Sequence, residues 1–143
     1  MAAGARVELL ANPTRPESRC PAMRFVQEFG YAVTPGKEEE HQAWVAANEE
    51  AIRAAHPDGT RHIGIFVTVY SSEKHAGFYR VFTELDSYAA IDSLAAAAKD
   101  DGSDFGRLIR EHSGFMDYSW DAPYSNGLHK SVVDATVFDP PSP

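Results

Sequence analysis

The chain has 143 residues, of which 43% are hydrophobic and 24% are charged, and its formal net charge is −8. These values are ordinary for one soluble globular domain with a core of its own. The acidic balance argues against a nucleic-acid partner, which requires a basic surface, and against an anionic membrane.

No stretch of the sequence is long and apolar enough to predict a membrane span, and no secretory signal is recognisable at the N-terminus. The single cysteine, Cys20, permits no internal disulfide. Its proline-flanked setting, "PESRCPAM", favours an inert thiol over a nucleophile. We therefore expect a cytoplasmic protein, and the abundance of alanine and arginine suits a bacterial source.

Residues 1–22 are interrupted by prolines and predict an extended arm, which either packs across a partner chain or is a floppy leader. Residues 23–33, "MRFVQEFGYAV", are rich in aromatic and β-branched residues and predict the first strand. Alternation places on one face of this strand Phe25, Gln27, Phe29, Tyr31 and Val33.

The stretch "TPGKEEE" predicts the start of a helix. Thr34 is a suitable N-cap, with Pro35 at the first helical position. The glutamates 38–40 lie near the positive end of the helix dipole, so they have a structural explanation. The helix ends at "HPDG", residues 56–59. Its periodicity gives one buried stripe formed by His41, Trp44, Val45, Asn48, Ala51, Ile52 and Ala55.

Residues 61–70, "RHIGIFVTVY", alternate and predict a second strand, with Ile63 and Ile65 on one face and His62 and Phe66 on the other. A turn, "SSEKHAG", leads to a third strand at 77–85. A helix capped by Asp86 or Ser87 follows, and then a short helix at 105–112. We expect a long aromatic loop, a last strand at 128–138 and a tail at 139–143.

This order, β-α-β-β-α-(α)-β, predicts an α+β protein of the ferredoxin-like, split βαβ type over residues 23–138. Its four-stranded antiparallel sheet would carry the helices on one face. We assign the opposite face to Phe25, Phe29, Tyr31, Phe66, Tyr70, Phe78 and Phe82. Because so short a chain has no third layer to cover these rings, we expect a homodimer in which two sheets pack face to face as an α/β barrel.

The order of elements and the stretch "VTPGKEEEHQAW" resemble the dimeric α/β-barrel superfamily, which includes antibiotic-biosynthesis-monooxygenase-like domains and stress-responsive barrel proteins. The turn at residues 35–38 is similar to the one that leads from the first strand into an acidic helix in that group. The stretch "FTELDSYAAIDSL" is similar to its third strand and second helix. The resemblance implies a fold more than a function, because the group includes cofactor-free oxygenases of aromatic polyketides, cyclases, haem-degrading enzymes, isomerases and proteins of no known activity.

Such a barrel implies an apolar pocket between the sheet and the helices. His62 is the candidate catalytic base, although a histidine at a strand end also often bonds a carbonyl or faces water. Arg80 is the second catalytic candidate and would hold a ligand anion; the alternative is an inter-subunit salt bridge. The candidate substrate-binding residues are Gln27, Phe29, Tyr31, Phe66, Tyr70, Phe82, His112 and Trp120.

Two functions follow. The first is a cofactor-independent oxygenase or cyclase that acts on an aromatic or polyketide-like molecule. The second is a non-catalytic dimeric small-molecule-binding or stress-response protein. A haem-binding or haem-degrading barrel is a further alternative, because one axial histidine suffices. We expect no metal and no cofactor, since the sequence lacks metal-ligand spacings, a Walker loop, a nucleophile elbow and a dinucleotide fingerprint. The sequence leaves open whether the protein is an enzyme.

Overall fold

The computed structural model describes residues 24–73 and 78–131, so the predicted arm, Cys20 and the C-terminal tail lie outside the described residues. The described elements are β1 (Phe25–Tyr31), α1 (Glu38–Ala55), β2 (Thr60–Val67), β3 (Tyr79–Leu85), α2 (Ala90–Lys99), α3 (Asp104–Ser113) and β4 (Tyr124–Lys130). The strands form one antiparallel sheet in the order β2-β3-β1-β4. This confirms the predicted ferredoxin-like α+β fold.

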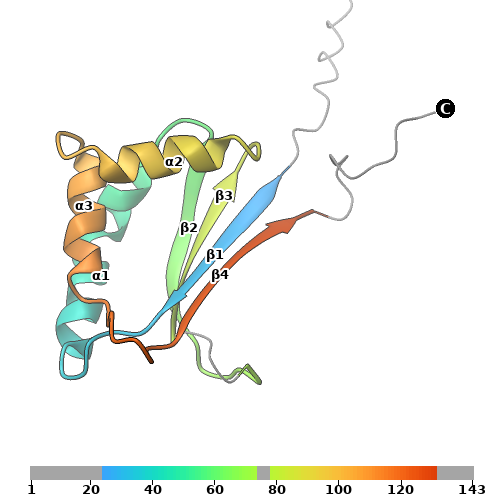
Figure 1. Cartoon of the computed structure of the whole chain (residues 1–143). Coiled ribbons are helices and arrows are strands. Elements are labelled where there is room, and N and C mark those ends of the chain that lie inside the picture. Colours follow the sequence, from blue (N-terminus) through green and yellow to red (C-terminus); the bar gives the residue numbers. More distant parts are fainter. Residues whose placement is uncertain (1–23, 74–77, 132–143) are drawn as a thin grey trace, which may run out of the picture.

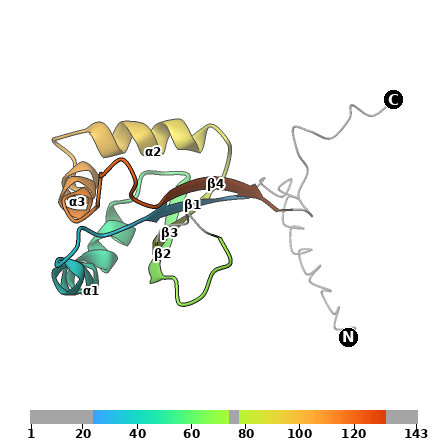
Figure 2. The same cartoon turned by 60° about the horizontal axis from the view of Figure 1, so that its bottom comes forward.

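All three helices lie on one side of the sheet (Figures 1 and 2). Helices α1 and α3 lie side by side at one end, and α2 runs across the other (Figure 1). The last strand begins at Tyr124, earlier than predicted, and residues 132–138 of the predicted strand lie outside the described residues. Among the described residues, no helix is long and apolar enough to cross a membrane.

Helix α1 begins later than the sequence predicted, and Thr34 is not its N-cap. The N-cap residue is Lys37, whose backbone N–H donates to the carbonyl of Thr34 at 3.0 Å. The Thr34 hydroxyl instead donates to the carbonyl of Met116 at 3.2 Å and so ties the α3–β4 loop to this turn. The turn contains Gly36 at φ +88°, a conformation that glycine adopts readily. Glu38, Glu39 and Glu40 form the first helical turn as predicted.

The face assignment of β1 was wrong. Phe25, Phe29 and Tyr31 lie on the helix-facing side, where Tyr31 hydrogen-bonds to side chains of α1 and α3. Alternation shows which residues share a face, but it does not show which face the helices cover.

On the open face, Phe66 and Phe82 meet edge to face with their ring centroids 5.5 Å apart. The ion pairs Arg61–Glu84 and Arg80–Glu28 flank these rings, so this face is more polar than predicted.

A β-bulge in β2 explains a second error. The register with β3 shifts between His62 and Gly64, so Ile63 is the extra residue. Past a bulge the alternation changes phase, and His62 therefore shares the helix-facing side with Ile65 instead of opposing it. A carboxylate oxygen of Glu49, on α1, accepts a hydrogen bond from the backbone N–H of Ile65 at 2.9 Å.

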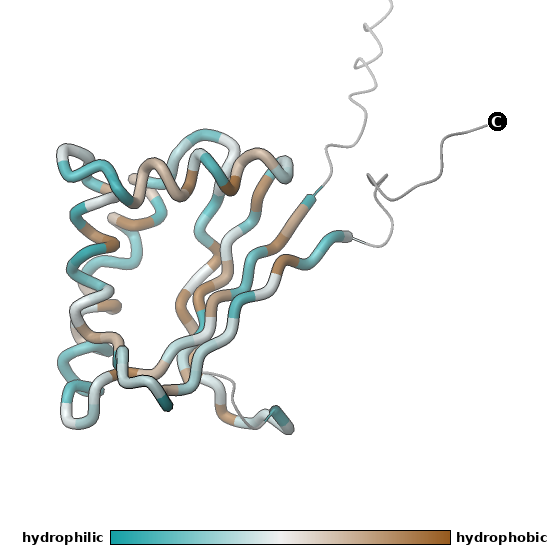
Figure 3. The backbone as a smooth tube through the Cα atoms, viewed as in Figure 1, coloured by the Kyte–Doolittle hydropathy of each residue, from teal (hydrophilic) through white to brown (hydrophobic). Residues whose placement is uncertain are grey.

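The interior has two hydrophobic clusters rather than one. The cluster under α2 contains Phe25, Leu85 and Ala90, with Ile91 and Leu94 packed against them. The cluster near α1 and α3 contains Tyr31, Val33, Tyr79, Phe29, Ile65, Val81, Phe115 and Met116. Hydrophobic stretches alternate with hydrophilic ones along strands and helices, as expected for elements buried on one side (Figure 3).

Candidate functional site

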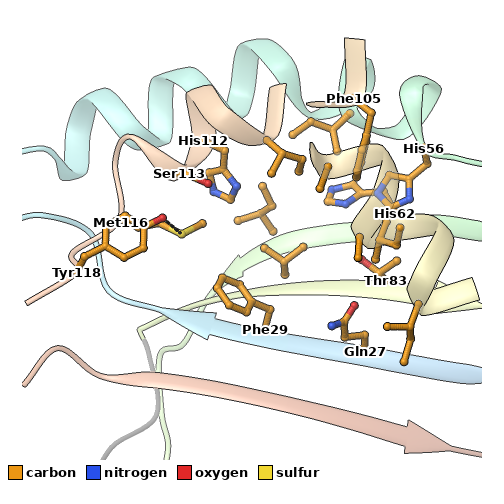
Figure 4. A pocket seen from close by; sticks show the side chains of 18 residues that line it. Gln27, Phe29, His56, His62, Thr83, Phe105, His112, Ser113, Met116 and Tyr118 are labelled. Carbon is orange, nitrogen blue, oxygen red and sulfur yellow. Dashed lines mark hydrogen bonds between the residues drawn. The ribbon is translucent and has the colours of Figure 1, made fainter. Parts of the chain in front are cut away.

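A cavity of about 320 Å³ lies between the sheet and the helices (Figure 4). It takes apolar walls from both hydrophobic clusters, including Phe29, Ile65, Val81, Met116, Ile91 and Leu94. A mostly apolar cavity of this size with a few polar groups is typical of a site for a small molecule.

The floor of the cavity is a polar row that crosses three strands. Gln27 on β1 is paired in register with Thr83 on β3, and Thr83 is paired with His62 on β2. All three residues line the cavity, and Figure 4 shows Gln27 and Thr83 rising from the sheet toward it. The bulge at Ile63 makes this row possible, because it brings His62 to the same face as Gln27 and Thr83.

The ring of His62 is fixed by Glu49. Nε2 of His62 lies 3.2 Å from a carboxylate oxygen of Glu49. A carboxylate can only accept a hydrogen bond, so neutral His62 carries its proton on Nε2 and donates it in this bond. Nδ1 is left as an acceptor; it is buried and has no hydrogen-bond partner among the described residues. Burial lowers the pKa of His62, and the Glu49 carboxylate opposes this shift by stabilising the imidazolium.

A second histidine, His56, lies at the same end of the cavity (Figure 4). The hydroxyl of Thr60 donates to the carbonyl of Pro57 at 2.7 Å, so Thr60 accepts from Nδ1–H of His56 at 2.8 Å. The remaining nitrogen, Nε2, is then an acceptor. Burial, followed by the charge of a protonated His62, lowers the pKa of His56 to about 4.

A third histidine, His112 on α3, lines the cavity nearer Met116 and Tyr118 (Figure 4). Its Nε2 lies 2.7 Å from the hydroxyl of Tyr31, and the same hydroxyl lies 2.8 Å from Nε2 of His41 on α1. The ring of Trp44 stacks on that of His112 at 5.4 Å and an interplanar angle of 2°.

These three bonded side chains are neutral near pH 7. Burial lowers the pKa of His112 to about 3, with smaller contributions from His41 and His62. Burial also lowers the pKa of His41 and raises the pKa of the Tyr31 hydroxyl well above its ordinary range.

The cavity thus has neutral histidines toward both ends, each with one nitrogen held by the protein. The geometry suits a bound molecule that carries oxygen atoms on a largely apolar frame. No group of three or more His, Cys, Asp or Glu side chains that could hold a metal ion occurs in residues 24–73 and 78–131.

Four of the residues chosen from sequence line this cavity: Gln27, Phe29, His62 and His112. Tyr31 does not line it but is hydrogen-bonded to His112, which does.

The other sequence candidates lie elsewhere. Arg80 is on the open face of the sheet, where it is paired with Glu28 and, at 2.9 Å, with Glu73. It lines a separate hollow with Phe66, Tyr70 and Phe82. Trp120 is 96% exposed in the α3–β4 loop. The structure therefore separates Arg80 from His62 by the thickness of the sheet.

Sequence reasoning missed Glu49, His56, Thr83 and the role of His41 in holding Tyr31. His41 had been placed on the buried stripe of α1, and a buried histidine needs a partner. That was the available signal, but its partner was out of reach because Tyr31 had been assigned to the wrong face. Helical periodicity places Glu49 beside the buried stripe, four residues after Val45 and three before Ile52, which was an available signal.

No protein-family model matches the chain, and no curated protein is similar to it in sequence. Solved structures share its fold. A NIPSNAP family protein from Agrobacterium tumefaciens is 18% identical with a TM-score of 0.56, covering 78% of this chain and 89% of that one. A second NIPSNAP family protein of unknown function from the same organism is 13% identical with a TM-score of 0.51, covering 79% and 91%.

The heme-degrader MhuD from Mycobacterium tuberculosis is 19% identical, covering 78% of this chain and 99% of that one, but its TM-score of 0.43 is too low to bear on function. The chain has a ferredoxin-like fold, which the two NIPSNAP family proteins share. At these identities the likeness concerns the fold alone.

Proposed function

We propose that the protein is a cofactor-independent enzyme that removes a proton from a small aromatic or polyketide-like molecule bound in the cavity. The observation that carries this proposal is the pair His62–Glu49 at a mostly apolar cavity. His62 alone among the cavity histidines is hydrogen-bonded to a carboxylate. A carboxylate that orients a histidine and stabilises its protonated form is a recurring arrangement in acid–base catalysis.

In this mechanism a small shift of the His62 ring brings Nδ1, which is buried in the structure, into contact with the substrate, and Nδ1 takes the proton from an acidic C–H or phenolic O–H. The electron pair of the broken bond stays on the substrate, where it is delocalised onto oxygen as an enolate or phenolate. Glu49 remains hydrogen-bonded to Nε2–H and offsets the new positive charge. His112, toward the other end, remains neutral and hydrogen-bonds to substrate oxygen, a role that a low pKa favours for an imidazole.

The same anion leads to either of the two expected reactions. In an oxygenase, a CH2 group flanked by aromatic rings is oxidised to a ketone by O2, one oxygen atom entering the product and the other leaving as water. In a cyclase, the carbanion forms a bond to a carbonyl carbon of the same molecule and water is then lost. Neither route requires a group that the cavity lining does not supply, apart from O2 in the first.

Oxygen uptake with dithranol, a tricyclic phenol with an acidic CH2 group, tests the oxygenase form. We expect His62→Gln to lower the rate at least about tenfold, a typical minimum for loss of a general base, while dithranol binding stays within about twofold. His129→Gln is the matched control, because His129 lies on the open face near Glu28 and does not line the cavity. Equal rates in His62→Gln and the wild type would remove this mechanism.

A second candidate function, binding without catalysis, is favoured by one observation. Burial lowers the pKa of His62, the proposed base, as well as that of His112, so both rings are weaker bases than a free imidazole and suit recognition of an oxygen atom better than proton transfer. In that case dithranol binds, and neither oxygen uptake nor cyclisation follows in the wild type.

The lining does not fit haem. Haem carries two propionates, and none of the residues that line the cavity is Lys or Arg. The nitrogen of His112 that Tyr31 does not hold is Nδ1, whose neighbouring Cβ crowds a planar macrocycle. The proposed mechanism therefore does not use haem.

For the assembly, we propose a homodimer formed through the open face. In a single chain Phe66 is 50% exposed beside Phe82. Arg80 would sit at the centre of this interface with its pairing to Glu28. Packing of this face against a second copy buries the two rings, which is what supports the proposal.

A further inference from the structure

One hydroxyl lies between two buried histidines in this protein. The Tyr31 oxygen is 2.8 Å from Nε2 of His41 and 2.7 Å from Nε2 of His112. A phenol has a single proton, so Tyr31 donates to one histidine and accepts from the other.

Two proton arrangements of the neutral side chains give the Tyr31 proton an acceptor; if both histidines donated to Tyr31, that buried proton would have none. In the first, His41 donates from Nε2 to Tyr31, and Tyr31 donates to Nε2 of His112. His112 then carries its proton on Nδ1. In the second, every bond is reversed: His112 donates to Tyr31, Tyr31 donates to His41, and His41 carries its proton on Nδ1.

The surroundings of His41 distinguish the two. His41 is 1% exposed, and its Nδ1 is buried with no hydrogen-bond partner among the described residues. The second arrangement would place an unpaired N–H there, and the first leaves only an unpaired lone pair. Buried N–H groups without a partner are rarer in proteins than under-satisfied acceptors, so the first arrangement is favoured.

We propose that His41 is a positioning residue: through Tyr31 it holds His112 in the form that presents Nδ1–H to the cavity, where it binds a carbonyl, enolate or phenolate oxygen. With its proton on Nδ1, His112 prefers a ligand atom that accepts a hydrogen bond, and its position alone does not give this preference. Its consequence for a ligand rests on the proposed function, whereas the proton positions can be measured without any ligand.

The stacking partner of His112 fixes the plane of its ring. Trp44 lies parallel to the imidazole, and its Nε1–H donates to a Glu111 carboxylate oxygen at 3.2 Å. The His112 ring is thus held on one face by Trp44 and at Nε2 by Tyr31. Figure 4 shows this ring at the edge of the cavity, beside Ser113.

The test is nitrogen NMR of the full chain with 15N-labelled histidine at pH 7, without ligand. We expect His112 to be protonated on Nδ1 and His41 on Nε2, because each tautomer has its own pair of ring-nitrogen shifts. His112 protonated on Nε2 in the wild type would overturn the proposal.

A matched pair of variants tests the role of His41. His41→Gln places an amide N–H near the former Nε2, so we expect His112 to keep its proton on Nδ1. His41→Phe removes the donor, and we expect the Nε2–H form of His112 to become populated. An unchanged His112 in His41→Phe, with the fold confirmed by its amide spectrum, would contradict the proposal. If His41→Phe does not fold, Tyr31→Phe serves instead, because it removes the proton donated to His112.

Binding of 2-naphthol tests the consequence for a ligand. We expect His41→Phe to bind 2-naphthol several-fold more weakly than the wild type, and His41→Gln to bind it about as tightly as the wild type. Wild-type tautomers as expected, together with no binding of 2-naphthol, would contradict the proposed function and leave the positioning role of His41 intact.

Discussion

One carboxylate oxygen of Glu49 lies 3.2 Å from Nε2 of His62 and 2.9 Å from the backbone nitrogen of Ile65. A single side chain of α1 therefore holds both the catalytic candidate and the bulge that turns it toward the helices. The edge strand β2, α1 and the cavity are connected through this one group.

Replacing Glu49 by Leu should destabilise the fold. It leaves the N–H of Ile65 and Nε2–H of His62 without their acceptor, and an unsatisfied buried donor costs about 1–3 kcal/mol. The free energy of unfolding in urea measures the loss. Glu50→Leu is the control, since Glu50 is exposed and its ion-pair partner among the described residues is Arg53, so this change should alter stability by no more than about 0.5 kcal/mol. Equal effects of the two substitutions would contradict the role assigned to Glu49.

Acid should destabilise the protein through His112. Its pKa is near its ordinary value of 6.5 in the unfolded chain and about 3 in the folded one. Between these values only the unfolded chain binds the proton, so stability falls as the pH falls, by about 1.4 kcal/mol per pH unit for this group. Between pH 7 and pH 5 the wild type should lose about 2 kcal/mol more than His112→Gln. The free energy of unfolding in urea, measured at pH 7 and pH 5, gives both losses. Equal losses in the wild type and in His112→Gln would contradict a buried, neutral His112.

Gly106 should not tolerate a side chain. A Cβ built there lies 2.1 Å from the carbonyl oxygen of Asp100, at the junction between α2 and α3. Because backbone must move to relieve this contact, Gly106→Ala should cost about 1–3 kcal/mol or more. In Gly102→Ala the nearest atom is 3.4 Å away, so this variant is the control. Thermal unfolding of both variants decides the question, and a Gly106→Ala protein as stable as the control would contradict the close approach.

A charge on the open face should separate the proposed dimer. Phe66→Glu would place a carboxylate where two sheets meet, whereas Tyr88→Glu changes an aromatic residue that is 64% exposed at the start of α2. In sedimentation at micromolar concentration we expect the first variant to be monomeric and folded, and the second to remain dimeric. A wild type that sediments as a monomer would contradict the interface.

The sequence was sufficient for the fold because each element carries its own signal. The aromatic and β-branched run of β1, the acidic first turn of α1 and the HPDG stop after it are local features, and the strand order follows from their succession. The predicted start of α1 was wrong because the Thr34 hydroxyl donates to the carbonyl of Met116, which is distant in the chain, and does not cap the helix.

The site could be predicted only in part. His62 and His112 could be chosen as titratable residues near strand and helix ends. Their placement in one cavity, however, depends on a bulge at Ile63 and on which face of β1 the helices cover. Both features arise from packing between distant segments, and no periodicity in β2 reveals an extra residue.

Recognition of oxygen on an apolar frame by the cavity histidines is the property on which the proposed function depends. Its most direct test compares the affinity of 2-naphthol with that of naphthalene, which differs only in lacking the hydroxyl, by shift mapping of the labelled full chain. We expect 2-naphthol to bind about tenfold more tightly than naphthalene and to shift the ring signals of His62 and His112. Equal affinities, or shifts confined to residues outside the cavity, would contradict it.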